Sequence, residues 1–198
     1  MADCGFYGKL PSQGDFVSRR LPWEFTSGWD DWLQQGLHAS RVALGERWLA
    51  LYLSAPVWRF QLAAGACGPQ GWRGFFFASV DRVGRYFPLT VAVADAPGDA
   101  PSLATLTGDD ERWLDCEDRA LAALDPRLAI DDFDLGVQAL ALPPARPRDP
   151  QAPAALLCLY TGGTDAMPAT SHAFAALPPP TSFAALMAAA DPAPELAP

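Results

Sequence analysis

The sequence predicts an α/β fold, a single-domain α/β/α sandwich whose central sheet is largely antiparallel or mixed and is flanked by helices. Two observations lead to this prediction. Short apolar runs rich in aromatic and β-branched residues are bounded by glycine and proline, as buried strands are. Other stretches place apolar residues at helical spacing. The chain has 198 residues, a length typical of one domain, which we assign to residues 1–191.

The first elements are a strand and a long helix. The strand is predicted over residues 4–10 and is followed by a loop over residues 11–15. The helix begins either at Pro22, because proline favours the first helical position, or at Ser27, which opens a capping-box pattern. One apolar face runs along this helix and is formed by Phe25, Trp29, Trp32, Leu33, Leu37 and Leu44.

A second, shorter helix and a strand come next. Gly45 is expected to end the long helix, and residues 46–53 form the short one, which stops before Pro56. Residues 57–62 alternate apolar and polar side chains from Trp58 onward. That alternation indicates a half-buried strand.

Two further strands complete an antiparallel meander. They are predicted over residues 74–78 and 89–94, which are apolar and rich in aromatic or β-branched side chains. The tight turn between them covers residues 81–84, where Gly84 can adopt a positive φ. A turn requires the glycine, but it does not require the charged side chains that surround it.

The C-terminal half alternates helices, a connector and a strand. A helix begins in a capping-box pattern at residues 107–110 and ends at Asp125, which precedes a proline. Residues 143–154 contain five prolines and are predicted to form an exposed connector. The chain then continues with a buried strand over residues 155–160, a loop over 161–165, a short helix over 182–189 and a disordered tail over 192–198.

The charge of the chain is unevenly distributed. The net charge is −9, with a net of +2 over residues 1–90 and −11 over the remainder. This balance argues against a nucleic-acid partner. The acidic stretch over residues 109–134 is expected to be a solvated helix face and loop, with a docking surface for a basic partner as the alternative. No run of 18 apolar residues and no signal-peptide pattern occurs, so we expect a cytoplasmic protein without membrane insertion.

No motif for catalysis or cofactor binding is found. The chain lacks GxSxG, HExxH and GK[ST] patterns. The four cysteines are widely spaced and are expected to be buried small hydrophobes: Cys4, Cys67, Cys116 and Cys158. His38 and His172 are expected to be packed or surface side chains, and the acidic groups at 109–111 and 131–134 lack the spacing of a calcium loop. We therefore expect no catalytic residue, no metal and no cofactor.

Five charged residues in two loops are the candidate functional residues. They are Asp15, Arg19, Asp81, Arg82 and Arg85, and they lie among aromatic and β-branched residues. Arginine next to aromatic residues is typical of interface anchors. The alternative is that the aspartates pair with the arginines and lock the loops to the sheet. Both roles can coexist, and the oligomeric state stays open.

Several ordered blocks of this sequence resemble one protein family. The similarity is densest over residues 4–95, and Leu159 to Gly162 are similar to the family's C-terminal strand. The blocks are GFYGKLPSQGDFV at 5–17, WDDWLQ at 29–34, SR at 40–41, YLSAPVWRF at 52–60 and SVDRVGRYFPLT at 79–90. In these residues the chain resembles the TagF proteins, also called ImpM, which are associated with bacterial type VI secretion.

The resemblance implies a cytoplasmic accessory protein with an α/β sandwich fold. It implies a post-translational regulator, generally a repressor, of type VI secretion assembly that binds the forkhead-associated scaffold protein of the system. Some members carry a fused phosphatase domain, whose metal motif is missing here. No catalytic residues are implied. The function expected from the residues and the resemblance is therefore non-enzymatic.

Two other classes of function are kept as alternatives. The first is a hydrolase or phosphatase-like enzyme, which would need a cleft with His172 or a carboxylate pair and a bound metal. Activity on phosphopeptides that a chelator abolishes would identify it. The second is a structural component of the secretion apparatus, which would co-purify with assembled particles.

Overall fold

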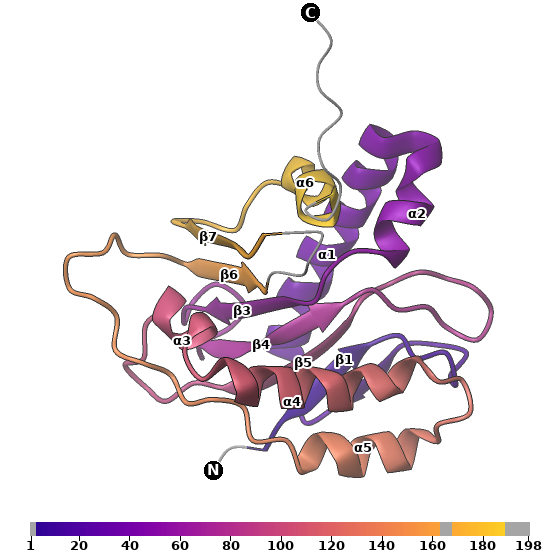
Figure 1. Cartoon of the computed structure of the whole chain (residues 1–198), viewed down its shortest axis with the longest axis horizontal. Coiled ribbons are helices and arrows are strands. Elements are labelled where there is room, and N and C mark those ends of the chain that lie inside the picture. The colour runs from indigo at the N-terminus through magenta and orange to yellow at the C-terminus, as the bar shows by residue number, and fades with distance from the viewer. Residues whose placement is uncertain (1–2, 163–167, 189–198) are drawn as a thin grey trace, which may run out of the picture.

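A seven-stranded sheet forms the centre of the computed structural model, which describes residues 3–162 and 168–188 (Figure 1). Its spatial order is β2-β1-β5-β4-β3-β6-β7, and every neighbouring pair of these strands is antiparallel. The predicted antiparallel meander is confirmed as β3-β4-β5. The strands are β1 (Gly5–Gly8), β2 (Val17–Arg19), β3 (Trp58–Leu62), β4 (Trp72–Phe77), β5 (Leu89–Ala94), β6 (Leu157–Thr161) and β7 (Thr170–Phe174).

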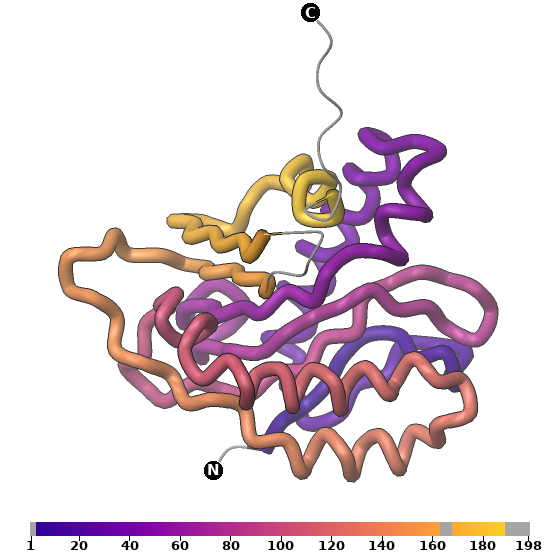
Figure 2. The backbone as a smooth tube through the Cα atoms, viewed as in Figure 1, coloured from indigo at the N-terminus to yellow at the C-terminus, as the bar shows by residue number. Residues whose placement is uncertain are grey.

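Helices lie on both sides of this sheet. Figure 1 shows α1, α2 and α6 on one side and α3, α4 and α5 on the other, and Figure 2 shows that α6 returns to α1 from the far end of the chain. The helices are α1 (Trp23–Leu44), α2 (Trp48–Leu53), α3 (Leu103–Thr107), α4 (Asp110–Leu121), α5 (Ile130–Gln138) and α6 (Phe183–Met187). Single 3-10 turns adjoin four of them: η1 (Gly45–Arg47) lies between α1 and α2, η2 (Ala122–Leu124) follows α4, and η3 (Pro180–Ser182) precedes α6.

The two sides of the sheet carry separate hydrophobic cores. Trp29 of α1 is at the centre of the first core, where its ring lies 4.6 Å from that of Phe60 and its indole N–H donates to Thr90 Oγ1 at 2.9 Å. Trp113 of α4 is fully buried in the second core beside Phe75. Because side chains alternate along each strand, β4 and β5 contribute apolar residues to both cores, whereas the apolar residues of β3 all lie in the first.

Strand β3 is fully buried, and the prediction of a half-buried strand is wrong. All five of its residues are buried, including Arg59 and Gln61 on the side of α3 and α4. Gln61 donates to Asp95 Oδ2 at 2.8 Å and accepts from the Ser102 N–H at 2.9 Å. The polar side chains of this strand therefore meet hydrogen-bond partners on the side of the second core rather than water, because helices cover both sides of the sheet.

The helix ends differ in part from the sequence prediction. Helix α1 follows Pro22 and Ser27 lies within it, so the capping box at Ser27 is wrong. Gly45 ends α1 as predicted, with a φ of 53°. Helix α4 begins at Asp110 without a side-chain capping bond, so the second capping box is wrong as well.

Four elements were missed by the sequence patterns. They are β2, α3, α5 and β7, which are short and contain polar residues. Contacts with the rest of the fold, rather than their own sequence pattern, determine these elements. For example, β2 and β7 form by pairing with β1 and β6 at the two edges of the sheet. The predicted tail over residues 192–198 and most of the loop over 161–165 lie outside the described residues.

The four thiols provide a test of the two cores. Each cysteine is free and buried, and burial raises the pKa of Cys4, Cys67 and Cys158 to about 11. Because the thiolate is the reactive form, none of them should react with DTNB in the folded protein at about pH 8. All four should react in concentrated guanidinium chloride. A thiol of the folded protein that reacts as fast as free cysteine would contradict this burial.

Candidate functional site

The connection between β4 and β5 is an ordered loop that carries three of the candidate residues. Val80 and Tyr86 form an isolated antiparallel bridge across its base. Within it, the Gly84 N–H donates to the Asp81 carbonyl at 3.0 Å and the Asp81 N–H donates to the Arg85 carbonyl at 3.1 Å. Gly84 has a φ of 85°, as its position in the turn predicted. We call residues 81–86 the Asp81 loop.

The carboxylate of Asp81 is the centre of a buried ion network. Its side chain is 0% exposed, and Oδ2 accepts from Lys9 Nζ at 2.9 Å and from Arg85 Nε at 2.6 Å. Oδ1 accepts from the backbone N–H groups of Val83 and Arg85 at 3.1 and 2.9 Å. Burial alone would raise the pKa of Asp81, but these hydrogen bonds and cations outweigh it and hold the pKa well below its usual range.

The same network joins the Asp81 loop to the loop that follows β1. Arg85 Nη2 donates to the Gly14 carbonyl at 2.6 Å, and the Arg82 N–H donates to the Gln13 carbonyl at 2.8 Å. The Ser79 hydroxyl donates to the Lys9 carbonyl at 2.7 Å. Residues from two blocks of the sequence therefore meet at one end of the sheet, and these hydrogen bonds hold the two loops together.

The candidate residues occupy different environments. Asp81 is buried, and the side chain of Arg85 is 54% exposed although its Nε bonds Asp81. Arg82 is exposed and forms no ion pair within the described part of the chain. Asp15 is 85% exposed, with Oδ1 4.0 Å from Arg85 Nη2, and the Arg19 guanidinium on the edge strand β2 donates to the Ser18 carbonyl. The geometry thus links Asp81 and Arg85 to loop locking and leaves Arg82 facing solvent.

Sequence reasoning missed two residues of this site. Lys9 provides the buried cation opposite Asp81, with only 5% of its surface exposed. Tyr52 of α2 donates its hydroxyl to the Ser79 carbonyl at 2.8 Å and accepts from the Ser79 N–H at 3.0 Å. Both residues lie in blocks that carry the family resemblance, which was the available signal. Their partners are distant in sequence, so the pairing itself could not be predicted.

A second buried ion network explains part of the acidic stretch. Arg59 of β3 donates to Glu117 Oε1 and to Asp110 Oδ1, both at 2.5 Å, and to the Leu106 carbonyl at 3.0 Å. Arg59 and Glu117 are buried, whereas the side chain of Asp110 is 52% exposed. The prediction of a purely solvated helix face is therefore wrong for this part of α4, because Glu117 points to the sheet.

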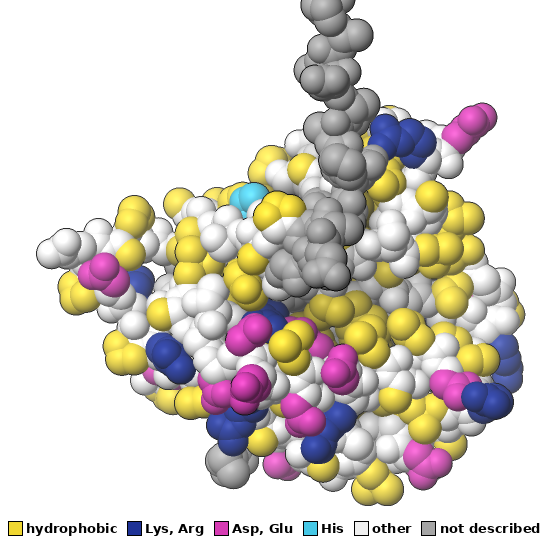
Figure 3. All heavy atoms as spheres, viewed as in Figure 1, with side chains coloured by type: hydrophobic (Ala, Val, Ile, Leu, Met, Phe, Trp, Pro, Cys, Tyr) yellow, Lys and Arg dark blue, Asp and Glu magenta, His cyan; other side chains and the backbone are white. Residues whose placement is uncertain are grey.

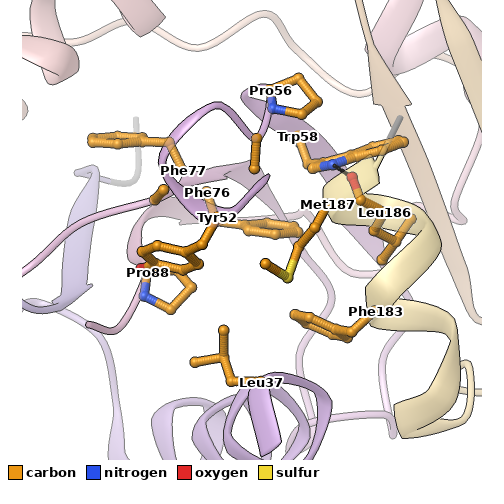
Figure 4. A pocket seen from close by; sticks show the side chains of 12 residues that line it. Leu37, Tyr52, Pro56, Trp58, Phe76, Phe77, Pro88, Phe183, Leu186 and Met187 are labelled. Carbon is orange, nitrogen blue, oxygen red and sulfur yellow. Dashed lines mark hydrogen bonds between the residues drawn. The ribbon is translucent and has the colours of Figure 1, made fainter. Parts of the chain in front are cut away.

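A small apolar cavity lies beneath α6 (Figure 4). It has a volume of about 30 Å³ and is surrounded by side chains of α1, α2, β3, β4 and α6, including Leu37, Trp58, Phe76, Phe183 and Met187. The Trp58 indole N–H donates to the Leu186 carbonyl at 3.1 Å across its edge. Its lining offers packing and no acid–base pair, so it fits a structural role.

Two of the larger cavities also lack an activated group. One of about 580 Å³ lies between α3, the 147–155 segment, β6 and β7, and its Cys158 thiol has a raised pKa. The other, of about 430 Å³, is lined in part by Tyr7 and Asp30, and the Tyr7 hydroxyl donates to Asp30 Oδ1 at 2.6 Å. Burial and this carboxylate raise the pKa of Tyr7, which is the opposite of activation as a nucleophile.

Metal ligands are not grouped in the described part of the chain. No cluster of three or more His, Cys, Asp or Glu side chains that could hold a metal ion occurs among those residues. His38 is exposed on α1, and His172 of β7 lies with its ring 5.9 Å from that of Trp58. None of the helices in the described ranges combines the length and the apolar composition that a membrane span requires.

Comparisons with known proteins identify the family of this chain. The model of the TagF N-terminal domain, described as type VI secretion system-associated, matches residues 5–140. The crystal structure of PA0076 from Pseudomonas aeruginosa PAO1, at 2.05 Å resolution, is similar over 98% of both chains with a TM-score of 0.82 and 34% sequence identity. No curated protein matches the sequence. The matched residues include both loops of the Asp81 network, and the chain belongs to the TagF family of type VI secretion system-associated proteins.

Proposed function

We propose that this protein is a non-enzymatic, cytoplasmic accessory factor that represses type VI secretion assembly after translation by binding the forkhead-associated scaffold protein. One observation carries the proposal. The family-matched region builds a loop that is held by the buried Asp81 and leaves Arg82 and Val83 at the surface. Such a loop is suited to contact with another protein.

The physical argument concerns the cost of ordering. A flexible loop loses conformational entropy when it binds, which weakens the complex. Here the backbone of Val83 and Arg85 is already fixed by bonds to the Asp81 carboxylate. We take the domain as an α/β/α sandwich that presents this preordered loop at one end of its sheet. A partner would then bind it without ordering it first.

The proposed function has a two-part test. The purified chain should bind the purified forkhead-associated scaffold protein of its own system in a calorimetric titration. In the host, deletion of the protein should raise type VI secretion and overproduction should lower it, because a bound scaffold is withheld from assembly. The chain with Asp132 changed to asparagine is a suitable control for handling, since Asp132 is exposed on α5 and belongs to neither of the two loops. Absence of binding, or unchanged secretion, would contradict the proposal.

A further inference from the structure

Exposed apolar side chains are concentrated near the Asp81 loop. Four of the nine large hydrophobic residues exposed among the described residues lie at this end: Phe16, Leu49, Leu53 and Val83. Figure 3 shows hydrophobic side chains gathered over α2, whereas Asp and Glu side chains gather over α4. Exposed apolar residues that cluster in this way mark interaction surfaces more often than scattered ones do.

Aromatic packing joins α2 to the loop. The Tyr86 ring lies 5.8 Å from that of Trp48 and 5.6 Å from that of Tyr52. Because Trp48 and Tyr52 point to the loop, their neighbours Leu49 and Leu53 are left on the outer side of α2 and are 42% and 60% exposed. We call Arg82, Val83 and Arg85 of the loop, together with Leu49 and Leu53 of the helix that the loop packs on through Tyr86, the arginine surface.

The charge of this surface is opposite to that of the chain. Arg82 has no carboxylate partner in the described part of the chain, while residues 91–198 carry a net charge of −11. The C-terminal half of the chain therefore repels an acidic partner, whereas the unpaired Arg82 attracts it, and this difference also orients the partner. Charge complementarity thus favours an acidic partner segment.

The number of free guanidinium groups indicates which anion fits. Arg85 already uses Nε for Asp81 and Nη2 for Gly14, so Arg82 alone offers a complete fork of donors. One planar fork matches one carboxylate in bidentate geometry, whereas a doubly charged phosphate is better held by several convergent cations. Val83, 66% exposed beside Arg82, provides an apolar contact.

We propose that the arginine surface binds an acidic segment of the scaffold protein that places a carboxylate on Arg82 and an apolar side chain against Val83 and α2. This inference rests on the proposed function and identifies the surface and the chemistry through which it acts. The carboxylate orients the partner and raises the rate of association, and the apolar side chain provides the buried contact.

The test compares two charge reversals of equal size. Arg82→Glu and Arg19→Glu each change the net charge by two units, but Arg19 lies on the edge strand β2. We expect Arg82→Glu to weaken binding of the full chain to purified scaffold about tenfold or more, and Arg19→Glu to change it less than about twofold. Val83→Ser should weaken binding as well, with Val42→Ser, at 74% exposure on α1, as its control. Melting temperatures should stay unchanged for all four variants.

Other outcomes separate the two proposals. Failure of the unmodified chain to bind the scaffold would overturn the proposed function itself. Binding that Arg82→Glu does not weaken, or that is insensitive to salt between about 50 and 300 mM, would overturn the arginine surface alone. A glutamate-rich peptide with one leucine should compete with the scaffold. Competition only by a phosphothreonine peptide, or self-association lost with Arg82→Glu, would overturn the carboxylate assignment.

Discussion

Replacing Asp81 with asparagine is expected to lower the free energy of unfolding by about 3–5 kcal/mol, the cost of removing one partner from a buried ion pair. Lys9 would remain buried without this counter-charge, because only 5% of its surface is exposed. Urea denaturation at about pH 7 measures the effect. Asp15→Asn is the matched control, since Asp15 is 85% exposed, and should be near neutral.

The pH dependence of the Asp81 variant gives a second measurement. The pKa of Asp81 is lowered in the folded state, so its stabilisation is complete above the pKa of the unfolded chain, about 4. The unfolded chain takes up the proton as the pH falls below that value. The difference between the unmodified chain and Asp81→Asn should therefore shrink below about pH 4. A difference that is constant from neutral to acid pH would show that charge is not the cause.

A double substitution separates the buried charge from the packing of the loop. Lys9→Met together with Asp81→Leu removes both ions and should cost less than Asp81→Asn alone, because neither member of the buried pair is left unpaired. The scaffold affinity of this double variant should still fall if the loop loses its order, since a leucine side chain cannot accept the hydrogen bonds that the Val83 and Arg85 N–H groups donate to Asp81. If the double variant loses as much free energy of unfolding as the two single substitutions lose together, Lys9 and Asp81 are not coupled and this account is contradicted.

Replacing Arg59 with methionine is the other substitution with a large expected effect, about 3–5 kcal/mol in the free energy of unfolding. Arg59 is 1% exposed and holds Glu117 of α4 and the Leu106 carbonyl against β3. Methionine would fill most of its volume but leave the Glu117 carboxylate buried without a cation. Backbone hydrogen exchange in α4 should accelerate with the loss of stability. Arg127→Met, which breaks an exposed pair with Asp125, is the control and should be silent.

The pH dependence of the Arg59 variant has the opposite sign to that of the Asp81 carboxylate. Burial raises the pKa of Glu117, and the Arg59 guanidinium offsets part of that rise. Without Arg59 the pKa of Glu117 should rise further, so the folded variant gains stability as the pH falls through that value and Glu117 becomes neutral. An Arg59→Met chain that loses stability equally at acid and neutral pH would contradict this account. Glu117→Gln in the same background should remove the dependence.

Local sequence patterns were sufficient to predict much of the fold. They failed for an element such as β3, which other parts of the chain cover on both sides. The meander of β3, β4 and β5, the end of α1 at Gly45 and the positive φ of Gly84 follow from strand periodicity and glycine chemistry. The alternation in β3 was assigned to a half-buried strand because a single sequence does not show whether a polar side chain meets water or a paired group. Its Arg59 meets Glu117, 58 residues away.

By itself the sequence determined most of the strands, the long helix, the family and the two loops that carry the candidate residues. The tertiary structure alone decided which of those charges point inward. Asp81 is neutralised by Lys9, 72 residues away, and Arg85 is divided between Asp81 and solvent, whereas Arg82 is left outside. The physical reason is that a turn motif specifies backbone conformation locally, but the burial of a charge depends on partners that only folding brings within hydrogen-bond distance.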